Sequence, residues 1–199
     1  MSDAVGRSAF SYQNFGPFWS ALASEDGPWS ADTMTRVYYA NGLPFTYALD
    51  GGWSGSYGYD SLLRLHTLSS PAGTFTYNYA NATGRQIASL GLPGGNSIAY
   101  GYDPAGLLTS TALKNSGNSV LDSAGYTYDA VGWRTNVLRA DGSHVGYGYD
   151  SIGQLTSATG FETGGTPRYN ENFGYTYDPA GNLTQRVNDT LSQTFTTDP

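Results

Sequence analysis

The chain repeats one short motif, in which two tyrosines are followed by an aspartate and, three residues later, by a glycine. The stretch YGYDPAGLL begins at Tyr100, and the close copies YGYDSIGQL and YTYDPAGNL begin at Tyr147 and Tyr175. Six tyrosine pairs recur at intervals of 20–28 residues and include 12 of the 17 tyrosines. Repetition at such a period is typical of an array of one small structural unit, so it constrains the fold more than any other feature.

Each copy of the motif has the local chemistry of a β-hairpin. Tyr-x-Tyr places both rings on one face of a strand, because side chains alternate with a period of two. Asp, Pro and Gly at the first, second and fourth positions suit a type I turn, and a final glycine with positive φ closes a hairpin with a bulge. The predicted fold class is therefore all-β, an array of short antiparallel β-hairpin repeats.

The repeated residues are assigned a structural role, because five near-equivalent aspartates fit five turn caps better than five catalytic sites. Two copies depart from the pattern: Leu63 replaces the turn glycine of one, and Ala80 replaces the aspartate of the next. Both of these turns are expected to be looser or differently shaped. The repeat-defining residues are Tyr57, Tyr59, Asp60, Tyr77, Tyr79, Gly84, Tyr100, Tyr102, Asp103, Gly106, Tyr126, Tyr128, Asp129, Gly132, Tyr147, Tyr149, Asp150, Gly153, Tyr175, Tyr177, Asp178 and Gly181.

The motif divides the chain into two expected parts. Residues 37–199 are expected to form the repeat array, with its last repeat truncated, and residues 1–36 an irregular N-terminal part with a cut repeat at 3–6. Residues 20–26 are expected to form a short helical turn, and longer loops are expected at 114–124 and 160–172. Both ends thus fall inside a repeat, which indicates a segment of a longer array. At 199 residues the chain is also long enough to bury a hydrophobic core.

The charge and composition exclude several kinds of partner. The formal net charge is −7, from 16 acidic and 9 basic residues, so the chain lacks the basic surface that binds nucleic acid. An anionic membrane surface is disfavoured for the same reason. No apolar run approaches the roughly 18 residues of a membrane span, the N-terminus is not a signal peptide, and there is no cysteine. The two histidines, His66 and His144, lie far apart, so no metal site and no cofactor is expected.

Four tryptophans are candidates for stacking on a ligand such as a sugar ring. An alternative, which we favour, is that they cover the faces of the sheet or the irregular N-terminal part. Motif aspartates about 20 residues apart could also form a paired-carboxylate site on neighbouring hairpins, but the equivalence of the copies speaks against catalysis. The candidate stacking residues are Trp19, Trp29, Trp53 and Trp133.

The recurring Tyr-x-Tyr-Asp-x-x-Gly-x-Leu-Thr resembles the YD repeat of RHS (rearrangement hotspot) proteins, which also occurs in wall-associated proteins, insecticidal toxin-complex subunits and teneurins. The resemblance covers residues 37–199 well and the first 36 poorly. It implies a long β-sheet that spirals into a hollow shell, which in RHS and toxin-complex proteins encloses a toxin. The self-cleaving core segment and the toxin domain of those relatives have no counterpart in this sequence.

The resemblance implies a non-enzymatic segment of a β-shell that encloses or presents another polypeptide such as a toxin. Its expected partners are the remainder of a longer YD-repeat polypeptide and an enclosed toxin, and its exposed edge strands could lead to self-association. The expected location is extracellular or at the cell surface, as part of a larger secreted protein. The alternative is an adhesin-like module that binds carbohydrate or protein through exposed aromatic residues. The tyrosine rings of successive repeats are expected to align and stack. Burial of this ladder of rings favours the shell, and a solvent-facing row favours the binding module.

Overall fold

The computed structural model describes residues 7–16, 19–50 and 52–196. In this part of the chain the secondary structure consists of 17 β-strands and one short 3₁₀ turn, η1 (Pro93–Gly95). Adjacent strands in the sequence pair antiparallel throughout each of two compact units, residues 1–98 and 99–199. The all-β prediction and its antiparallel hairpins are therefore confirmed.

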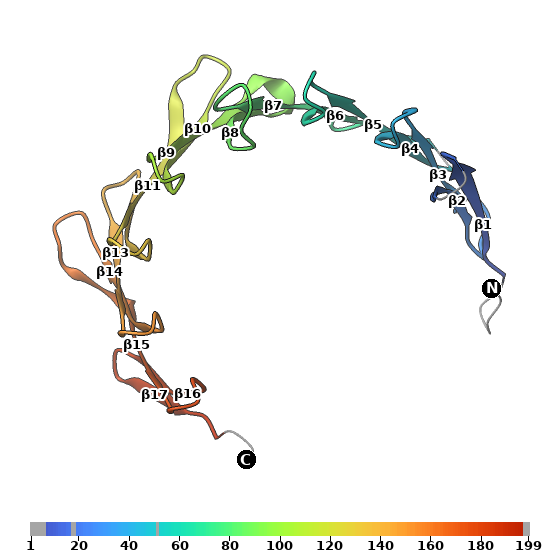
Figure 1. The fold of residues 1–199 in the computed structure, drawn as a ribbon. Helices are drawn as coiled ribbons and strands as arrows, with labels where there is room; N and C mark the ends of the chain where they lie inside the picture. Colours follow the sequence, from blue (N-terminus) through green and yellow to red (C-terminus); the bar gives the residue numbers. More distant parts are fainter. Residues whose placement is uncertain (1–6, 17–18, 51, 197–199) are drawn as a thin grey trace. The chain divides into compact units, whose positions relative to one another are not determined.

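The first unit is a succession of hairpins in chain order (Figure 1). Each strand pairs with the one before it, from the pair β1–β2 to the pair β7–β8. The strands are β1 (Ala9–Asn14), β2 (Ser20–Asp26), β3 (Met34–Tyr38), β4 (Pro44–Leu49), β5 (Trp53–Tyr59), β6 (Leu65–Ser70), β7 (Gly73–Tyr79) and β8 (Ile87–Gly91).

The second unit has the same organisation, and it begins within β9, most of whose residues belong to this unit. Pairing again follows the chain, from β9–β10 to β16–β17. The strands are β9 (Ser97–Tyr102), β10 (Leu108–Lys114), β11 (Val120–Tyr128), β12 (Arg134–Arg139), β13 (His144–Tyr149), β14 (Leu155–Phe161), β15 (Pro167–Tyr177), β16 (Leu183–Asn188) and β17 (Leu191–Thr194).

A β-bulge accompanies the second tyrosine of the motif. In the β13–β14 hairpin, for example, Gly148 pairs with Ser157, whereas Tyr149 pairs with Leu155, so Thr156 is the extra residue. The same one-residue shift occurs just before Tyr59, Tyr79, Tyr128 and Tyr177. Bulges increase the local twist of a strand pair, and here they fall at a fixed place in each of these hairpins.

The described residues of neither unit form a hydrophobic core, which corrects the expectation from chain length. Among the described residues Ala158, at 9% exposure, is the one hydrophobic residue classed as buried. The reason is topological: every strand pairs with its neighbours in sequence, and within each unit no second layer of strands or helices packs on the sheet. Both faces of each unit therefore stay partly open.

Three local predictions are wrong. Residues 20–26 form strand β2 rather than a helical turn, because they pair with β1 from Asn14 to Ala9. Most of 114–124 and 160–172 is not loop either: β10 and β11 extend to Lys114 and from Val120, and β14 and β15 extend to Phe161 and from Pro167. The cut repeat at 3–6 lies outside the described residues, as do the last three residues of the truncated repeat. The division of the chain at residue 36 stays a prediction.

Candidate functional site: the aspartate turn and the links between hairpins

The motif aspartate holds its turn together with one carboxylate oxygen. In the turn of Asp150, Oδ1 accepts hydrogen bonds from the backbone N–H of Ile152 at 3.0 Å and of Gln154 at 2.9 Å. The Asp150 carbonyl accepts from Gly153 N–H at 3.2 Å, and Gly153 has a φ of 88°. The positive φ is the conformation that glycine adopts at little cost. The turn that the sequence predicted, with a positive-φ glycine closing the hairpin, is thus the one observed.

The turn without a glycine is not looser, contrary to expectation. Leu63 adopts a φ of 59°, and its N–H donates to the Asp60 carbonyl at 2.9 Å, as glycine does in the other copies. Asp60 Oδ1 still accepts from Leu62 N–H and Arg64 N–H at 2.9 and 3.0 Å. The left-handed conformation costs a residue other than glycine about 1–2 kcal/mol. The turn therefore keeps its shape at the expense of strain in the backbone of Leu63.

The turn without an aspartate does have a different shape, as expected. Ala80 N–H donates to the carbonyl of Gln86 at 2.8 Å, which closes a longer loop. Asn81 takes the place of the missing aspartate, because its Oδ1 accepts hydrogen bonds from the backbone N–H of Thr83 and of Gly84. An asparagine side chain can cap a turn in the same way as an aspartate.

The second tyrosine of the motif links its hairpin to the preceding one. In four copies its hydroxyl donates a hydrogen bond to the backbone carbonyl of the residue that begins the strand after the previous aspartate turn. Tyr149 on β13, for example, reaches the carbonyl of Arg134 on the adjacent strand β12 at 2.9 Å. The further links of this kind are Tyr79 to Leu65 at 2.7 Å, Tyr128 to Leu108 at 2.7 Å and Tyr177 to Leu155 at 2.8 Å.

This link was not predicted: the expectation was that tyrosine rings of successive repeats align and stack. The 12 motif tyrosines are all half-buried, and their ring contacts involve residues outside the six pairs, as between Tyr47 and Tyr57 at 5.3 Å. Successive motif strands are separated by a return strand, which keeps their tyrosine rings apart, and the linking hydroxyls bond to the backbone of that adjacent return strand. Direct stacking is therefore replaced by hydrogen bonding to the backbone.

Removing one of these linking hydroxyls is expected to destabilise the chain, whereas removing the hydroxyl of the first tyrosine of the same motif is not. Tyr149→Phe should lower the free energy of unfolding by about 1 kcal/mol, the usual contribution of one hydrogen bond. Tyr147→Phe is the matched control, since Tyr147 lies on the same face of β13 and its hydroxyl has no hydrogen bond to the described residues. Urea denaturation of both variants checks the difference, and equal effects would contradict the assigned link.

A second link runs along the turns themselves. The residue that follows the turn glycine extends over the turn glycine of the next hairpin. A Cβ placed on Gly153 would lie 2.6 Å from Cζ2 of Trp133, so only a glycine fits under that ring. Leu107 lies over Gly132 in the same manner, and Gln154 lies at Gly181, to whose carbonyl its amide donates at 3.5 Å. Trp19, which does not follow a glycine, also lies over a turn glycine, Gly42.

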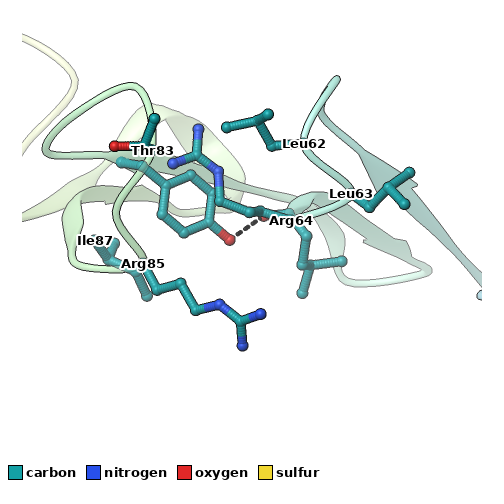
Figure 2. Close-up of a pocket in the computed structure, with 8 residues that line it drawn as sticks. Leu62, Leu63, Arg64, Thr83, Arg85 and Ile87 are labelled. Carbon is teal, nitrogen blue, oxygen red and sulfur yellow. Dashed lines mark hydrogen bonds between the residues drawn. The ribbon is translucent and has the colours of Figure 1, made fainter.

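Arg64 makes this link with its guanidinium. Figure 2 shows its side chain extending toward the loop that carries Thr83. Its Nε donates to Oδ2 of Asp60 at 2.7 Å, and its Nη1 donates to the carbonyls of Asn81 and Gly84. The guanidinium also lies 4.1 Å from the ring centroid of Tyr79, a cation–π contact. One side chain thus joins the aspartate turn of one repeat to the loop and the tyrosine of the next.

The four candidate tryptophans lie in different surroundings. Trp133 is half-buried between Gly153 and the ring of Tyr149, at 5.4 Å between centroids, so it acts as a spacer between turns. Trp19 stacks on Phe15 at 4.4 Å. Trp53 contacts Tyr47 at 5.0 Å and is 47% exposed, and Trp29 is 67% exposed. The rings therefore contact different neighbours, and within the first unit Trp19, Trp29 and Trp53 do not form one platform.

The motif carboxyls whose pKa departs from its usual value are held in the ionised form. At Asp178, hydrogen bonds from the Asn182 side chain and then from backbone N–H groups lower the pKa. At Asp60, partial desolvation acts to raise the pKa, but hydrogen bonds from Arg64 and Leu62 outweigh it, and the pKa is lowered. A catalytic acid needs the opposite shift, so these two carboxyls behave as turn caps.

The lowered pKa values make stability depend on acid pH. The unfolded chain binds protons at Asp60 and Asp178 more tightly than the folded chain. The two ionised carboxylates therefore stabilise the fold fully above the usual carboxyl pKa of 3.8, and this stabilisation is lost as pH falls below that value. We expect the melting temperature to fall as pH is lowered from about 4.5 to 2.5. Circular dichroism melts check this. Asp178→Asn should make the melting temperature depend less on pH in this range. The same dependence in the variant and the original chain would contradict a role for the Asp178 carboxylate.

Sequence comparisons find no matching family model and no matching curated protein. The fold, by contrast, matches solved structures. A structure of the Photorhabdus luminescens Tc holotoxin pore with a mutated TccC3 aligns with a TM-score of 0.65 and 21% identity over 83% of this chain. Crystal structures of TcdB2-TccC3, with Cdc42 and without the hypervariable C-terminal region, align over 90% of the chain at 15% and 16% identity, with lower TM-scores of 0.47.

The chain spans about a tenth of the length of the Tc toxin chain that it matches, with a coverage of 10%. The likeness concerns the fold, and it agrees with the resemblance of the sequence motif to the YD repeat. The chain therefore shares the repeating β-hairpin fold of that Tc toxin structure. Among the described residues, no helix is long and apolar enough to span a membrane.

Proposed function

We propose that this chain is a structural, non-enzymatic wall segment of an RHS-type shell, and that the shell encloses or presents another polypeptide such as a toxin. The observation that carries the proposal is the coreless sheet: the described part of the chain buries one hydrophobic residue, Ala158, and leaves both faces of each unit partly open. A sheet is normally stable only when another layer covers its apolar face. The remainder of a longer polypeptide and its enclosed passenger would provide that layer.

The contacts between hairpins support the same role. Tyrosine hydroxyls and the residues after the turn glycines link each hairpin to the next in a regular way. These links use the repeated residues of the motif, which are therefore the parts of a continuous wall. We propose the extracellular space or the cell surface as its location, in keeping with the secreted proteins that the motif resembles.

The alternative role, an adhesin-like surface that binds carbohydrate, is less well supported. The strongly exposed aromatic residues Tyr12, Trp29 and Tyr169 are 61%, 67% and 79% exposed and lie on β1, after β2 and on β15. The motif tyrosines, in contrast, are all half-buried. A scattered set of rings does not provide the row of stacking surfaces that such a module would need.

Limited proteolysis of the complete polypeptide that contains this chain tests the wall function. A passenger enclosed by the shell should resist protease at concentrations that digest it once it has been released by denaturation. Peptides identified by mass spectrometry over time show which segment is protected. If every segment outside the wall is digested as quickly as the released passenger, the proposal is wrong and a glycan-binding screen becomes the next experiment.

A further inference from the structure

The two departures from the repeat lie next to each other and form the two sides of one pocket. Its volume is about 560 Å³, within the usual range for ligand sites. Figure 2 shows Leu62 and Leu63 on the aspartate turn, and Thr83, Arg85 and Ile87 on the facing loop and the start of β8. Leu65 and Tyr79 complete the lining. A regular repeat has a glycine in place of Leu63 and a shorter loop, so it would lack these walls.

The apolar side of this pocket is built at an energetic cost. Leu63 has a φ of 59° and is 58% exposed, and Leu62 is 50% exposed. An exposed leucine in the left-handed conformation gains little from burial, whereas a glycine there would avoid the strain. Backbone strain of this kind is concentrated at functional sites, where the surrounding structure maintains it. The strain therefore favours a role for the Leu63 side chain in contact with another molecule.

The polar side of the pocket carries one available cation. Arg64 is engaged by Asp60, by two backbone carbonyls and by the Tyr79 ring. Arg85 is exposed and forms no ion pair with the part of the chain that the structure describes. A guanidinium beside an apolar surface is suited to a carboxylate attached to an apolar group.

We propose that this pocket, the Leu63–Arg85 pocket, binds an extended polypeptide segment that carries an acidic residue next to a large apolar residue. The apolar side chain contacts Leu62, Leu63 and Ile87, and the carboxylate binds the guanidinium of Arg85. The choice of a polypeptide as ligand rests on the proposed wall function, because an enclosed chain would run along the wall. The pocket would then hold one segment of the passenger at a fixed position.

The test uses the 199-residue chain and the peptide Ac-Gly-Phe-Glu-Gly-NH₂, with the matched Gln peptide and hexanoate for comparison. NMR titration follows the methyl groups of Leu62, Leu63 and Ile87. The Glu peptide is expected to bind about 10-fold more tightly than the Gln peptide, as one charge-assisted hydrogen bond would provide. It should also bind more tightly than hexanoate, since a peptide makes more contacts. Arg85→Gln should abolish the preference for the Glu peptide, and Leu63→Gly should weaken the binding of both peptides by the same factor.

Arg186→Gln is the matched control, because Arg186 is exposed on β16 and lies outside the pocket. Equal affinity for the Glu and Gln peptides, or no binding of either, would overturn the proposal. Binding of hexanoate as tightly as the Glu peptide would overturn the choice of a polypeptide as ligand. These results are independent of the protease test of the shell, in which the passenger can be enclosed without occupying this pocket.

Discussion

Replacing Gly153 with valine is expected to lower the free energy of unfolding by about 3 kcal/mol, the combined cost of a left-handed non-glycine residue and of overpacking. Gly153 has a φ of 88°, and a Cβ there would lie 2.6 Å from Cζ2 of Trp133. A β-branched side chain is strained in this conformation wherever it occurs, and here the tryptophan ring also occupies the space it needs. The substitution should therefore disturb two successive turns.

Urea denaturation measures the effect, and Gly164→Val provides the matched control. A Cβ on Gly164 has no neighbour within 4 Å, and its φ lies outside the left-handed region. Valine at residue 164 should therefore change stability by no more than about 0.5 kcal/mol. If both variants unfold at the same urea concentration, the turn contact between Trp133 and Gly153 does not stabilise the array.

Replacing Arg64 with alanine is expected to cost about 2–3 kcal/mol, because one guanidinium serves two repeats. Its side chain is 15% exposed, bonds Asp60 at 2.7 Å and donates to the carbonyls of Asn81 and Gly84. Arg64→Lys should restore little of the loss, since an ammonium cannot reproduce the planar fork of donors over the Tyr79 ring. A full rescue by lysine would show that charge alone matters at this position.

Thermal melts and urea denaturation compare these variants with Arg186→Ala. Arg186 is exposed and donates to the side chain of Gln193, so its removal should change stability by less than about 0.5 kcal/mol. A loss at Arg64 no larger than that at Arg186 would contradict the link between the two repeats.

The repeated motif was sufficient to predict the hairpins, the aspartate caps and the positive-φ glycines. All three are local: an aspartate caps N–H groups two and four residues ahead, and the glycine conformation follows from the turn type. The same local reasoning could not show that Leu63 would keep the turn intact. The neighbouring hydrogen bonds from Leu62 and Arg64 to Asp60 hold it in that shape despite the strain.

The tyrosine links between hairpins could not be predicted, because they join residues 14–22 positions apart, as in the bonds of Tyr79 and Tyr177. A signal was present nonetheless: the second position is tyrosine in all six copies, never phenylalanine, which indicates that the hydroxyl has a role. The missing core was also beyond local reasoning. Chain length indicates how much surface could be buried, but each strand here pairs with its sequence neighbours, and the sheet does not fold back within either unit.

Cryo-electron microscopy of the complete polypeptide that contains this chain tests the central claim most directly. The wall account predicts that the hairpins of residues 20–194 form part of a continuous wall. One face of the sheet should then point toward density from another segment of polypeptide. A structure in which both faces of these hairpins are in contact with solvent alone would contradict the account.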